Sequence, residues 1–367
     1  MIRSMKLLGL IGLVSATLVT VGLSQPAGAS RSEGHHHHDD RLKHVFVIVL
    51  ENHARDQVIN DPNTPFITKL AHRYGVASNY YGVTHPSLPN YVAMVAGSNF
   101  GVNNDDPANR FNAMNLADQL EAHHMTWATY QESMPSVGYL GDFYPDSTNP
   151  LYASKHNPFV LMNDIRSDPA RLENVKPYGR FKHDLRHGRV ANFVMIVPNQ
   201  CHDMHGGVYG SVGGGSPCAY NDVNNDPADV YLKQQADAFV HTAVHRIMDS
   251  KAWGKGSAIF IVADESDYLG TSMFGWADTS GCCDTPVLPV GSPLPDTTNL
   301  WTGGPYGGGL SPAIVIAGDG PRHFVSTVPY NHYSFLTTLE KDWHLGYLGN
   351  AGDTAGGVLP MNDLLDN

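Results

Sequence analysis

The chain has 367 residues, with 23 Lys and Arg against 35 Asp and Glu, and a formal net charge of −12 with histidine neutral. This acidic balance argues against nucleic-acid binding, which requires basic surface patches. The length suits one large α/β domain or two small ones and is ample for a substantial hydrophobic core.

Residues 1–29 have the features of a secretory signal peptide. The basic residues Arg3 and Lys6 precede an apolar run from Leu7 to Leu23, and Ala27-Gly28-Ala29 forms a small-residue cleavage site. The apolar run is short for a bilayer crossing. We therefore expect a secreted or extracytoplasmic protein that keeps no integral membrane segment after signal cleavage.

The rest of the chain is expected to form a short linker and a single domain. Residues 30–43 are polar and are predicted to be a disordered linker, whose His35–His38 run is either native or a tag. The domain would cover residues 44–367. Stretches at about 133–190 and about 266–310, rich in Pro, Tyr and Asn or in Gly, Pro and Thr, are predicted to be long loop insertions that wall or cover a site.

Apolar runs alternate with helical patterns along this domain. Continuous runs typical of buried parallel strands lie at 44–52, 191–200, 257–267 and 312–320. Helical patterns lie at 64–75, 113–124, about 229–249 and 333–346. The alternation indicates an α/β fold with a largely parallel central sheet and helices on both faces.

The segment THPSLPNYVAMVAGS, residues 84–98, changes from a proline-braced polar stretch to an apolar helix. Ser87 stands at the mouth of that helix, where unpaired N–H groups and the helix dipole favour an anion. A serine at this position is either a helix cap or a nucleophile.

Polar side chains follow the predicted strands at the points where the strands end. They are Glu51 and Asn52, Asp203 and His205, and Asp264 and Glu265. Ligands of parallel sheets bind beyond the carboxyl ends of the strands, so we expect these residues to meet Ser87 at one rim. Carboxylates that share a small site need a compensating cation. With histidine nearby, the ligand set fits one divalent ion per site: Mg, Ca, Mn, Zn or Fe.

The chain contains four cysteines, Cys201, Cys218, Cys282 and Cys283. An even number in an exported chain favours disulfides over free thiols. Three pairings are open, and one of them joins the adjacent residues Cys282 and Cys283. We expect the disulfides to brace the rim.

Five motifs, taken in chain order, resemble the bacterial phosphoesterase family of the alkaline phosphatase superfamily, which includes acid phosphatases and phospholipases C. They are LENH (50–53), THPSLPNY (84–91), VPNQCHDMH (197–205), VADESD (262–267) and NHYSFLTTLE (331–340). The resemblance implies a nucleophile at Ser87, a phosphate-oxygen partner at Asn90 and phosphate-pocket residues at Asp203 and His205. It implies metal ligation by Glu51, Asn52, Ser87, Asp264 and Glu265, and site roles for His85 and His332.

These inferences lead to one leading hypothesis and two alternatives. The leading hypothesis is a secreted, metal-dependent phosphoesterase that hydrolyses small phosphate monoesters through a phosphoserine, with His205 or His332 protonating the leaving group or guiding the water. The first alternative is a phospholipase C that acts on phosphodiester lipids. The second is a non-catalytic phosphate or metal binder with the same fold.

Overall fold

The computed structural model describes residues 42–207, 218–219, 224–266, 278–283, 285 and 306–366. These residues belong to one compact unit, Asp40–Asn367. The predicted signal peptide, the His35–His38 run and most of the predicted insertion at 266–310 lie outside the described residues.

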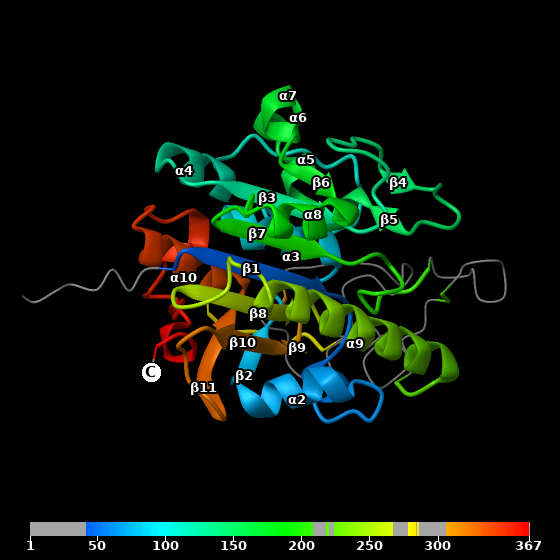
Figure 1. Cartoon of the computed structure of the whole chain (residues 1–367), viewed down its shortest axis with the longest axis vertical. Coiled ribbons are helices and arrows are strands. Elements are labelled where there is room, and N and C mark those ends of the chain that lie inside the picture. Colours follow the sequence, from blue (N-terminus) through cyan, green and yellow to red (C-terminus); the bar gives the residue numbers. More distant parts are fainter. Residues whose placement is uncertain are drawn as a thin grey trace, which may run out of the picture. The chain divides into compact units, whose positions relative to one another are not determined.

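Within the described residues, a nine-stranded sheet forms the centre of this unit (Figure 1). Its strands are β1 (His44–Leu50), β2 (Gly75–Tyr81), β3 (Trp127–Gln131), β6 (Val175–Pro177), β7 (Phe193–Val197), β8 (Ser257–Ala263), β9 (Leu310–Ser311), β10 (Ala313–Ala317) and β11 (Phe324–Asn331). Their order is β11-β2-β10-β8-β1-β7-β3-β6, and β9 pairs with β2. A separate hairpin joins β4 (Phe143–Tyr144) to β5 (Tyr152–Ala153).

The sheet is largely parallel, as predicted. Strand β1 is parallel to β7 and β8, β3 is parallel to β6 and β7, and β2 is parallel to β11. Strand β10 is antiparallel to both β2 and β8. The expectation of a parallel strand at 312–320 is therefore wrong, because an apolar run buried on both faces has the same composition in either direction.

Helices cover both faces of the sheet (Figure 1). One core contains residues of α3 (Ser87–Ala96), α4 (Leu116–Ala122), α5 (Pro158–Leu161), α6 (Asn163–Arg166) and α10 (His332–Trp343). The other contains residues of α1 (Arg55–Val58), α2 (Pro65–Arg73), α8 (Phe181–Arg186) and α9 (Pro227–Met248). Short elements complete the unit: α7 (Pro169–Leu172) and 3-10 turns at Ser154–His156, Tyr178–Arg180, Gly349–Gly352 and Asn362–Leu364.

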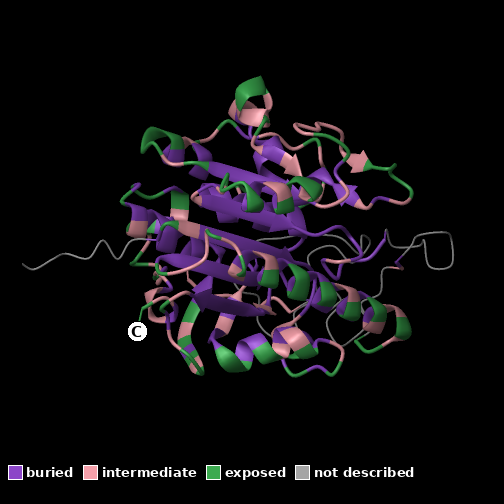
Figure 2. Cartoon of the chain, in the orientation of Figure 1, coloured by how far each residue is buried: buried purple, intermediate pink, exposed green. Residues whose placement is uncertain are grey.

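The central strand β1 shows why the sequence folds into these layers. Val45, Val47 and Val49 belong to one core, whereas the alternate residues Phe46, Ile48 and Leu50 belong to the other. Successive side chains of a strand point to opposite faces, so a strand covered on both faces must be apolar throughout. Figure 2 accordingly shows the central strands buried along their length.

Among the strands that the sequence analysis did not predict, β2 and β11 lie toward one side of the sheet. Strands β2 (GVASNYY) and β11 (FVSTVPYN) mix polar with apolar residues and lack a continuous apolar run. Ser78 and Asn79 of β2 donate side-chain hydrogen bonds to the backbone of β11. The polar residues that obscured the strand pattern are thus used in pairing the two strands.

Residues 133–190 are not one long loop, contrary to the prediction. They contain short helices and strands, and two of the helices begin at Pro158 and Pro169. Proline is favoured in the first turn of a helix, where its missing N–H costs nothing. The prolines that suggested a loop therefore mark helix starts.

Both disulfides lie within the described residues. Cys201 pairs with Cys218, and Cys282 pairs with its neighbour Cys283. Asn331 donates side-chain hydrogen bonds to the carbonyl oxygens of Cys282 and Cys283, at 3.1 and 3.3 Å. The adjacent cysteines therefore contact the first turn of α10, because Asn331 also caps that helix.

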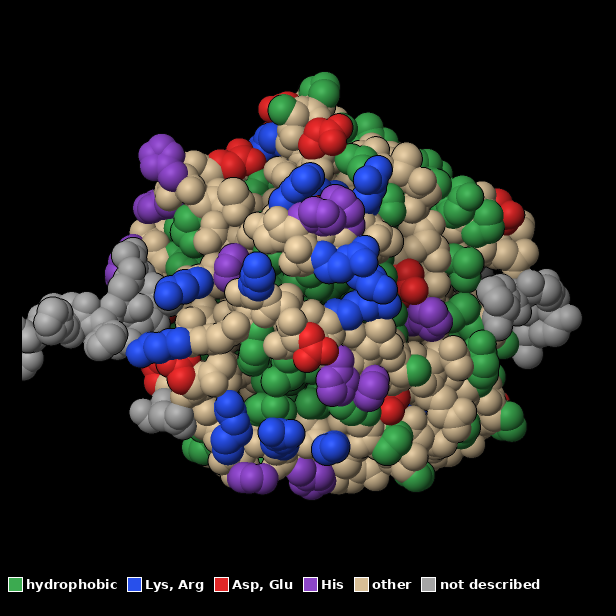
Figure 3. Space-filling view, viewed as in Figure 1, with side chains coloured by type: hydrophobic (Ala, Val, Ile, Leu, Met, Phe, Trp, Pro, Cys, Tyr) green, Lys and Arg blue, Asp and Glu red, His purple; other side chains and the backbone are tan. Residues whose placement is uncertain are grey.

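The surface of the face that carries α8 and α9 is mixed in character. Lys, Arg and His side chains are spread across it, with a few acidic residues among them (Figure 3). The net negative charge of the chain is therefore not concentrated on this face. Among the described residues, no helix combines the length and the apolar character that a bilayer crossing requires.

Candidate active site

Ser87 is the first residue of α3 and lies at the carboxyl edge of the sheet. Pro86 occupies the N-cap position, and Ser87 does not cap the helix. The Ser87 hydroxyl instead lies 2.8 Å from Oε2 of Glu51 and 3.1 Å from Oε1 of Glu265. Ser87 is 1% exposed. The geometry thus favours the nucleophile over the helix cap.

The hydroxyl of Ser87 carries one proton but contacts two carboxyl groups. It can donate a hydrogen bond to only one of them at a time. The second oxygen–oxygen contact is repulsive unless a carboxyl proton or a cation lies there. The two contacts together therefore require a carboxyl proton or a cation in addition to the hydroxyl proton of Ser87.

The acidic residues meet because their strands are neighbours in the sheet. In the register of β1 and β8, Leu50 is opposite Ala263, so the next residues, Glu51 and Asp264, lie side by side. One ligand oxygen from each of Glu51, Asp264 and Glu265 can be chosen so that all three lie within 4.8 Å of one another. All three residues are buried. The predicted convergence of the strand ends is therefore present in the fold.

Burial changes the proton affinity of these carboxyl groups. It is the largest influence on each, and it raises the pKa of Glu51 to about 8 and the pKa of Asp264 well above its usual range. Neighbouring negative charge acts in the same direction on both. Burial also raises the pKa of Glu265, although His85 opposes that rise.

Asn52 completes the oxygen-rich part of the site. Its backbone lies in the left-handed region with φ of 48°, which asparagine tolerates better than most residues. Its N–H donates to Oδ1 of Asp264 at 3.3 Å, and its own Oδ1 is buried without a hydrogen-bond partner. Oδ2 of Asp264 also lacks a hydrogen-bond partner, and Oε1 of Glu51 has only a 3.0 Å contact with Nε2 of His156.

These residues fit a bound divalent cation. Buried polar atoms are almost always satisfied, and unpaired carboxylate oxygens are costly to bury. Carboxylate and amide oxygens are the donors that hard divalent cations prefer. The groups able to hold the ion are Glu51, Asn52, Asp264 and Glu265, with the Ser87 hydroxyl beside them.

A histidine-containing group adjoins the acidic residues at Glu51. Nε2 of His156 lies 3.0 Å from Oε1 of Glu51, and its Nδ1 lies 3.6 Å from Oδ2 of Asp203. Glu51, His156 and His205 form a second set of atoms close enough to share an ion. Burial lowers the pKa of His156 well below its usual range and that of His205 to about 3, and the nearby Lys155 acts in the same direction. Burial therefore favours the neutral form of both imidazoles.

Asp203 and His205 lie where the sequence predicts them, beyond the end of β7. The Asp203 carbonyl accepts a hydrogen bond from the N–H of Glu51 at 2.7 Å, which fixes the two strand ends together. Oδ1 of Asp203 accepts from the N–H of His205 at 2.8 Å. Burial raises the pKa of Asp203 well above its usual range, and Glu51 adds to that rise.

His85 lies in the turn before Ser87 and contacts Glu265. Its Nδ1 hydrogen-bonds to Oε2 of Glu265, and its Nε2 contacts the carbonyl oxygen of Asp278 at 2.9 Å. Burial opposes protonation of His85, but the adjacent carboxylate of Glu265 outweighs it and raises the pKa of the imidazole. His85 therefore pairs directly with the carboxyl group that contacts Ser87.

The side chains of Asn90 and His332 both form hydrogen bonds to neighbouring protein groups. Oδ1 of Asn90 accepts from the N–H groups of Val83 and Thr84, and its Nδ2 donates to the carbonyls of Thr84 and Pro86. This amide holds the turn before Ser87, and both of its amide hydrogens are used there. The predicted contact with a phosphate oxygen would require Asn90 to give up one of these bonds.

Both ring nitrogens of His332 are also occupied. Nε2 hydrogen-bonds to the carbonyl oxygen of Asp264, and Nδ1 lies 2.9 Å from the Tyr80 hydroxyl. Burial lowers the pKa of His332 to about 4. In this arrangement, His332 positions the strand end that carries Asp264.

Close backbone approach near Ser87 depends on glycine. A Cβ on Gly308 would lie 2.4 Å from the carbonyl oxygen of Thr84, and a Cβ on Gly82 would lie 2.8 Å from that of Asp264. Contacts this short do not occur with real Cβ atoms. The absence of a side chain at both positions lets the turn before Ser87 approach the end of β8.

Three residues of the site were not predicted from the sequence: Asp105, Lys155 and His156. Lys155 lies 2.7 Å from Oδ2 of Asp105 and 3.2 Å from Nε2 of His205. Lys155 could have been noticed in the sequence, because it is the one Asp, Glu, Lys or Arg between Asp146 and Asp164. The stretch 133–190 was predicted to form the wall of a site, and Lys155 and His156 both come from this stretch.

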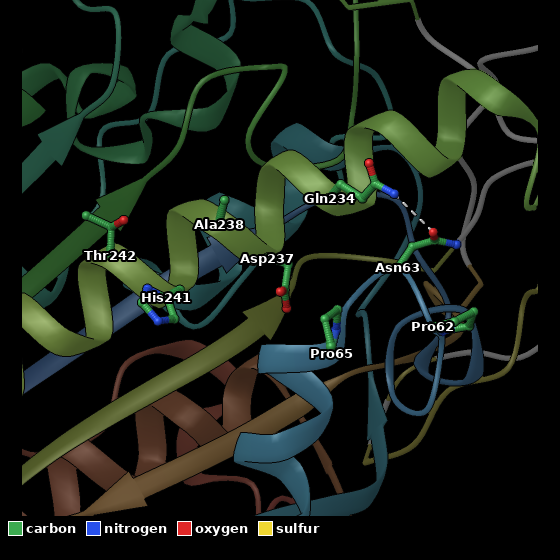
Figure 4. A pocket seen from close by; sticks show the side chains of 8 residues that line it. All are labelled: Pro62, Asn63, Pro65, Gln234, Asp237, Ala238, His241 and Thr242. Carbon is green, nitrogen blue, oxygen red and sulfur yellow. Dashed lines mark hydrogen bonds between the residues drawn. The ribbon is translucent and has the colours of Figure 1, made fainter.

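A separate hollow lies on the other face of the sheet, between the start of α2 and the side of α9 (Figure 4). Asp237 of α9 points into it and accepts hydrogen bonds from the N–H groups of Phe66 and Ile67, so its carboxylate caps α2. Gln234 reaches across the hollow to Asn63 at 3.3 Å. None of the residues around Ser87 lines it.

The fold and the site together define an α/β protein with a serine, buried carboxylates and imidazoles at the carboxyl edge of its sheet. A model of the Phosphoesterase family matches residues 59–346, and the chain belongs to that family. The predicted membership of the phosphoesterase family is thereby confirmed, and four of the five sequence motifs lie within the matched residues.

Two kinds of relative are similar to parts of this chain. A phosphate-repressible acid phosphatase of Penicillium chrysogenum is 38% identical over 170 residues, which cover 45% of this chain and 39% of the relative. A phosphatidylinositol-3-phosphatase of Mycobacterium tuberculosis is 29% identical over 208 residues, covering 56% and 64%. The chain therefore spans less than two thirds of the length of each relative.

Solved structures show a distant likeness. A protein of the alkaline phosphatase superfamily from Vibrio parahaemolyticus gives a TM-score of 0.46 at 11% identity and covers 84% of this chain and 67% of its own. Murine ectonucleotide pyrophosphatase/phosphodiesterase 5 gives a TM-score of 0.49 at 10% identity, covering 86% and 99%.

Proposed function

We propose that this protein is an exported, cation-dependent phosphatase that hydrolyses phosphate monoesters through a phosphoserine formed on Ser87. The observation that carries the proposal is the contact of the Ser87 hydroxyl with two buried carboxyl groups, those of Glu51 and Glu265. The pattern of residues 1–29 supports export.

The reaction would proceed in two displacements. The Ser87 hydroxyl gives its proton to Glu265, which His85 supports from the other side, and its oxygen attacks phosphorus. The bond from phosphorus to the ester oxygen breaks, and the displaced alkoxide takes a proton from solvent. Water then attacks phosphorus, the bond from phosphorus to the Ser87 oxygen breaks, and that oxygen takes back the proton held by Glu265 as phosphate leaves.

Positive charge would offset the negative charge on the phosphoryl oxygens. A divalent cation held by Glu51, Asn52, Asp264 and Glu265 would supply it and would lower the pKa of the serine hydroxyl. The N–H groups at the start of α3 add partial positive charge. His205, with its pKa lowered to about 3, is a poor proton donor. We therefore assign protonation of the leaving group to solvent instead of to His205 or His332.

The names of the relatives support a monoester substrate. The Penicillium protein is an acid phosphatase and the Mycobacterium protein is a phosphatidylinositol-3-phosphatase, and phosphatases of both kinds cleave monoesters. Neither name is that of a phospholipase C. A phosphoinositide remains a second candidate substrate because of the Mycobacterium relative.

The test compares Ser87→Ala with Ser136→Ala, an exposed serine in the same chain. With p-nitrophenyl phosphate and added divalent cation, Ser87→Ala should lose at least about a thousandfold in kcat, whereas Ser136→Ala should retain full activity. Acid quenching of the wild-type reaction should trap phosphate on the peptide that contains Ser87. Full activity in Ser87→Ala, or turnover of bis(p-nitrophenyl) phosphate alone, would overturn the proposal.

A further inference from the structure

Lys155 is a buried lysine on the wall of the site. It occupies the middle of the 3-10 turn Ser154–His156, between β5 and α5, and is 9% exposed. Its ammonium lies 2.7 Å from Oδ2 of Asp105 and 3.2 Å from Nε2 of His205. Lysine is rarely buried this far, because its charge must be compensated. The ammonium is thus held at a fixed position and does not extend into solvent.

Asp105 connects this ammonium to the start of α3. Its Oδ2 contacts Lys155, and its Oδ1 accepts a 2.9 Å hydrogen bond from the N–H of Leu88, the residue after Ser87. One carboxylate thus bridges a helix-mouth N–H and an ammonium with its two oxygens. A phosphoryl group also presents two oxygens on one atom, and it binds to the same kinds of donor.

The carboxylate of Asp105 can be displaced more readily than the two groups that it bridges, the Lys155 ammonium and the Leu88 N–H. The side chain of Asp105 is 26% exposed, compared with 11% for that of Lys155. Asp105 lies in the irregular segment between α3 and α4, whereas Leu88 is in the first turn of a ten-residue helix. Displacement of Asp105 would expose both donors next to Ser87.

The surrounding charges keep Lys155 ionised. Burial opposes its charge, but Asp105, Glu51 and Glu265 outweigh burial and raise the pKa of the ammonium above its usual range. The ammonium in turn lowers the pKa of Glu51 and that of Asp203. It therefore places positive charge in a group of residues that would otherwise repel a phosphate ester.

We propose that Lys155 binds a phosphoryl oxygen of the substrate, and that Asp105 occupies this anion site until phosphate displaces it. His205 orients the ammonium through Nε2. This inference rests on the proposed function for the identity of the substrate, but phosphate binding can be measured without turnover.

The experiment measures binding of inorganic phosphate by calorimetry to the full chain, with divalent cation present, and KM and kcat for p-nitrophenyl phosphate in parallel. Lys155→Met should weaken phosphate binding by about 10- to 100-fold, the effect of losing one charge-assisted hydrogen bond. Lys155→Arg should retain most of it. The matched control is Lys176→Met, because Lys176 also pairs with an aspartate, Asp184 at 3.0 Å, outside the site.

Asp105→Asn separates the proposal from a purely structural ion pair. Removal of a competing carboxylate should tighten phosphate binding by about threefold or more and lower KM, because substrate no longer has to displace a charged group. A structural pair predicts the opposite, since loss of Asp105 would then release Lys155. Weaker phosphate binding in Asp105→Asn would overturn displacement, and unchanged binding in a folded Lys155→Met would overturn the assignment of Lys155. If Lys155→Met does not fold, the phosphate affinities of Lys155→Arg and Asp105→Asn test the proposal in its place.

The two proposals fail in different ways. Turnover of monoesters by the wild type, with phosphate binding unaffected by Lys155→Met, would leave the proposed function standing and remove Lys155 from it. Phosphate binding that depends on Lys155, without turnover of monoesters, would support the role of Lys155 and overturn the proposed function. A wild type that neither binds phosphate nor turns over monoesters in the presence of any divalent cation would overturn both.

Discussion

Removal of divalent cations should destabilise this protein measurably, because the acidic residues at the strand ends are held close together. One oxygen from each of Glu51, Asp264 and Glu265 lies within 4.8 Å of the others, which corresponds to about 3 kcal/mol of repulsion per pair of full charges at an effective dielectric constant of about 20. Three such pairs approach about 10 kcal/mol, comparable to the whole stability of a typical domain, so the charges cannot remain uncompensated. Retained protons relieve part of this repulsion, and a bound cation relieves it more completely.

The expected effect follows from binding linkage. A cation at about 100 times its dissociation constant adds about 2.7 kcal/mol to the free energy of unfolding. For a chain of this size, that corresponds to a rise in Tm of about 5 °C. The measurement is calorimetric unfolding at pH 8 of chelator-treated protein, with and without millimolar Mg²⁺, Ca²⁺, Mn²⁺ or Zn²⁺.

The control is the double variant Asp264→Asn, Glu265→Gln, which removes two of the three ionisable carboxyl groups while nearly preserving shape. It should be more stable than the wild type in chelator and should not respond to added cation. The reasoning is refuted if no cation shifts the wild-type Tm, or if the variant is less stable than the wild type in chelator.

Two further predictions concern buried charge outside the site. Lys233 is fully buried with its ammonium 3.1 Å from Asp61 and 3.0 Å from Asp229, so Lys233→Met should cost about 3–5 kcal/mol in urea unfolding because it leaves the Asp61 carboxylate without its cation and Asp229 with His53 alone. The exposed Lys69→Met should change stability by less than about 0.5 kcal/mol, and equal effects of the two substitutions would contradict this account. Burial raises the pKa of Glu340 to about 8, so the folded state binds its proton more tightly than the unfolded state and stability should fall as pH rises from about 5 to 8. Glu340→Gln should remove up to about 4 kcal/mol of this fall in unfolding measured across that pH range, and identical pH profiles for the two proteins would disprove the assignment.

Much of the fold was predictable because it depends on local patterns. The apolar runs at β1, β7 and β8 are continuous, since each strand is covered on both faces. The polar residues that end these runs, such as Glu51 and Asp264, lie at one edge of the sheet because the strands are parallel. Ser87 could be placed next to them because its helix begins at the same edge.

The antiparallel direction of β10 and the pairing of Cys282 with Cys283 were not predictable in this way. Composition does not encode strand direction, and cysteine spacing does not fix disulfide connectivity. The hydrogen-bond partners of Asn90 and His332 were not predictable either, because they are defined only in the folded chain.

The sequence by itself thus determined the class of the sheet, the helix that carries Ser87 and the strand ends that supply the carboxylates. Only the tertiary structure decided which other side chains join them: Asp105 and Lys155 are 50 residues apart in sequence and come from irregular segments with no periodic pattern. A strand or a helix fixes the direction of its side chains through a repeating backbone geometry that sequence periodicity reports. A turn has no such repeat, so the position of Lys155 depends on the packing of its surroundings.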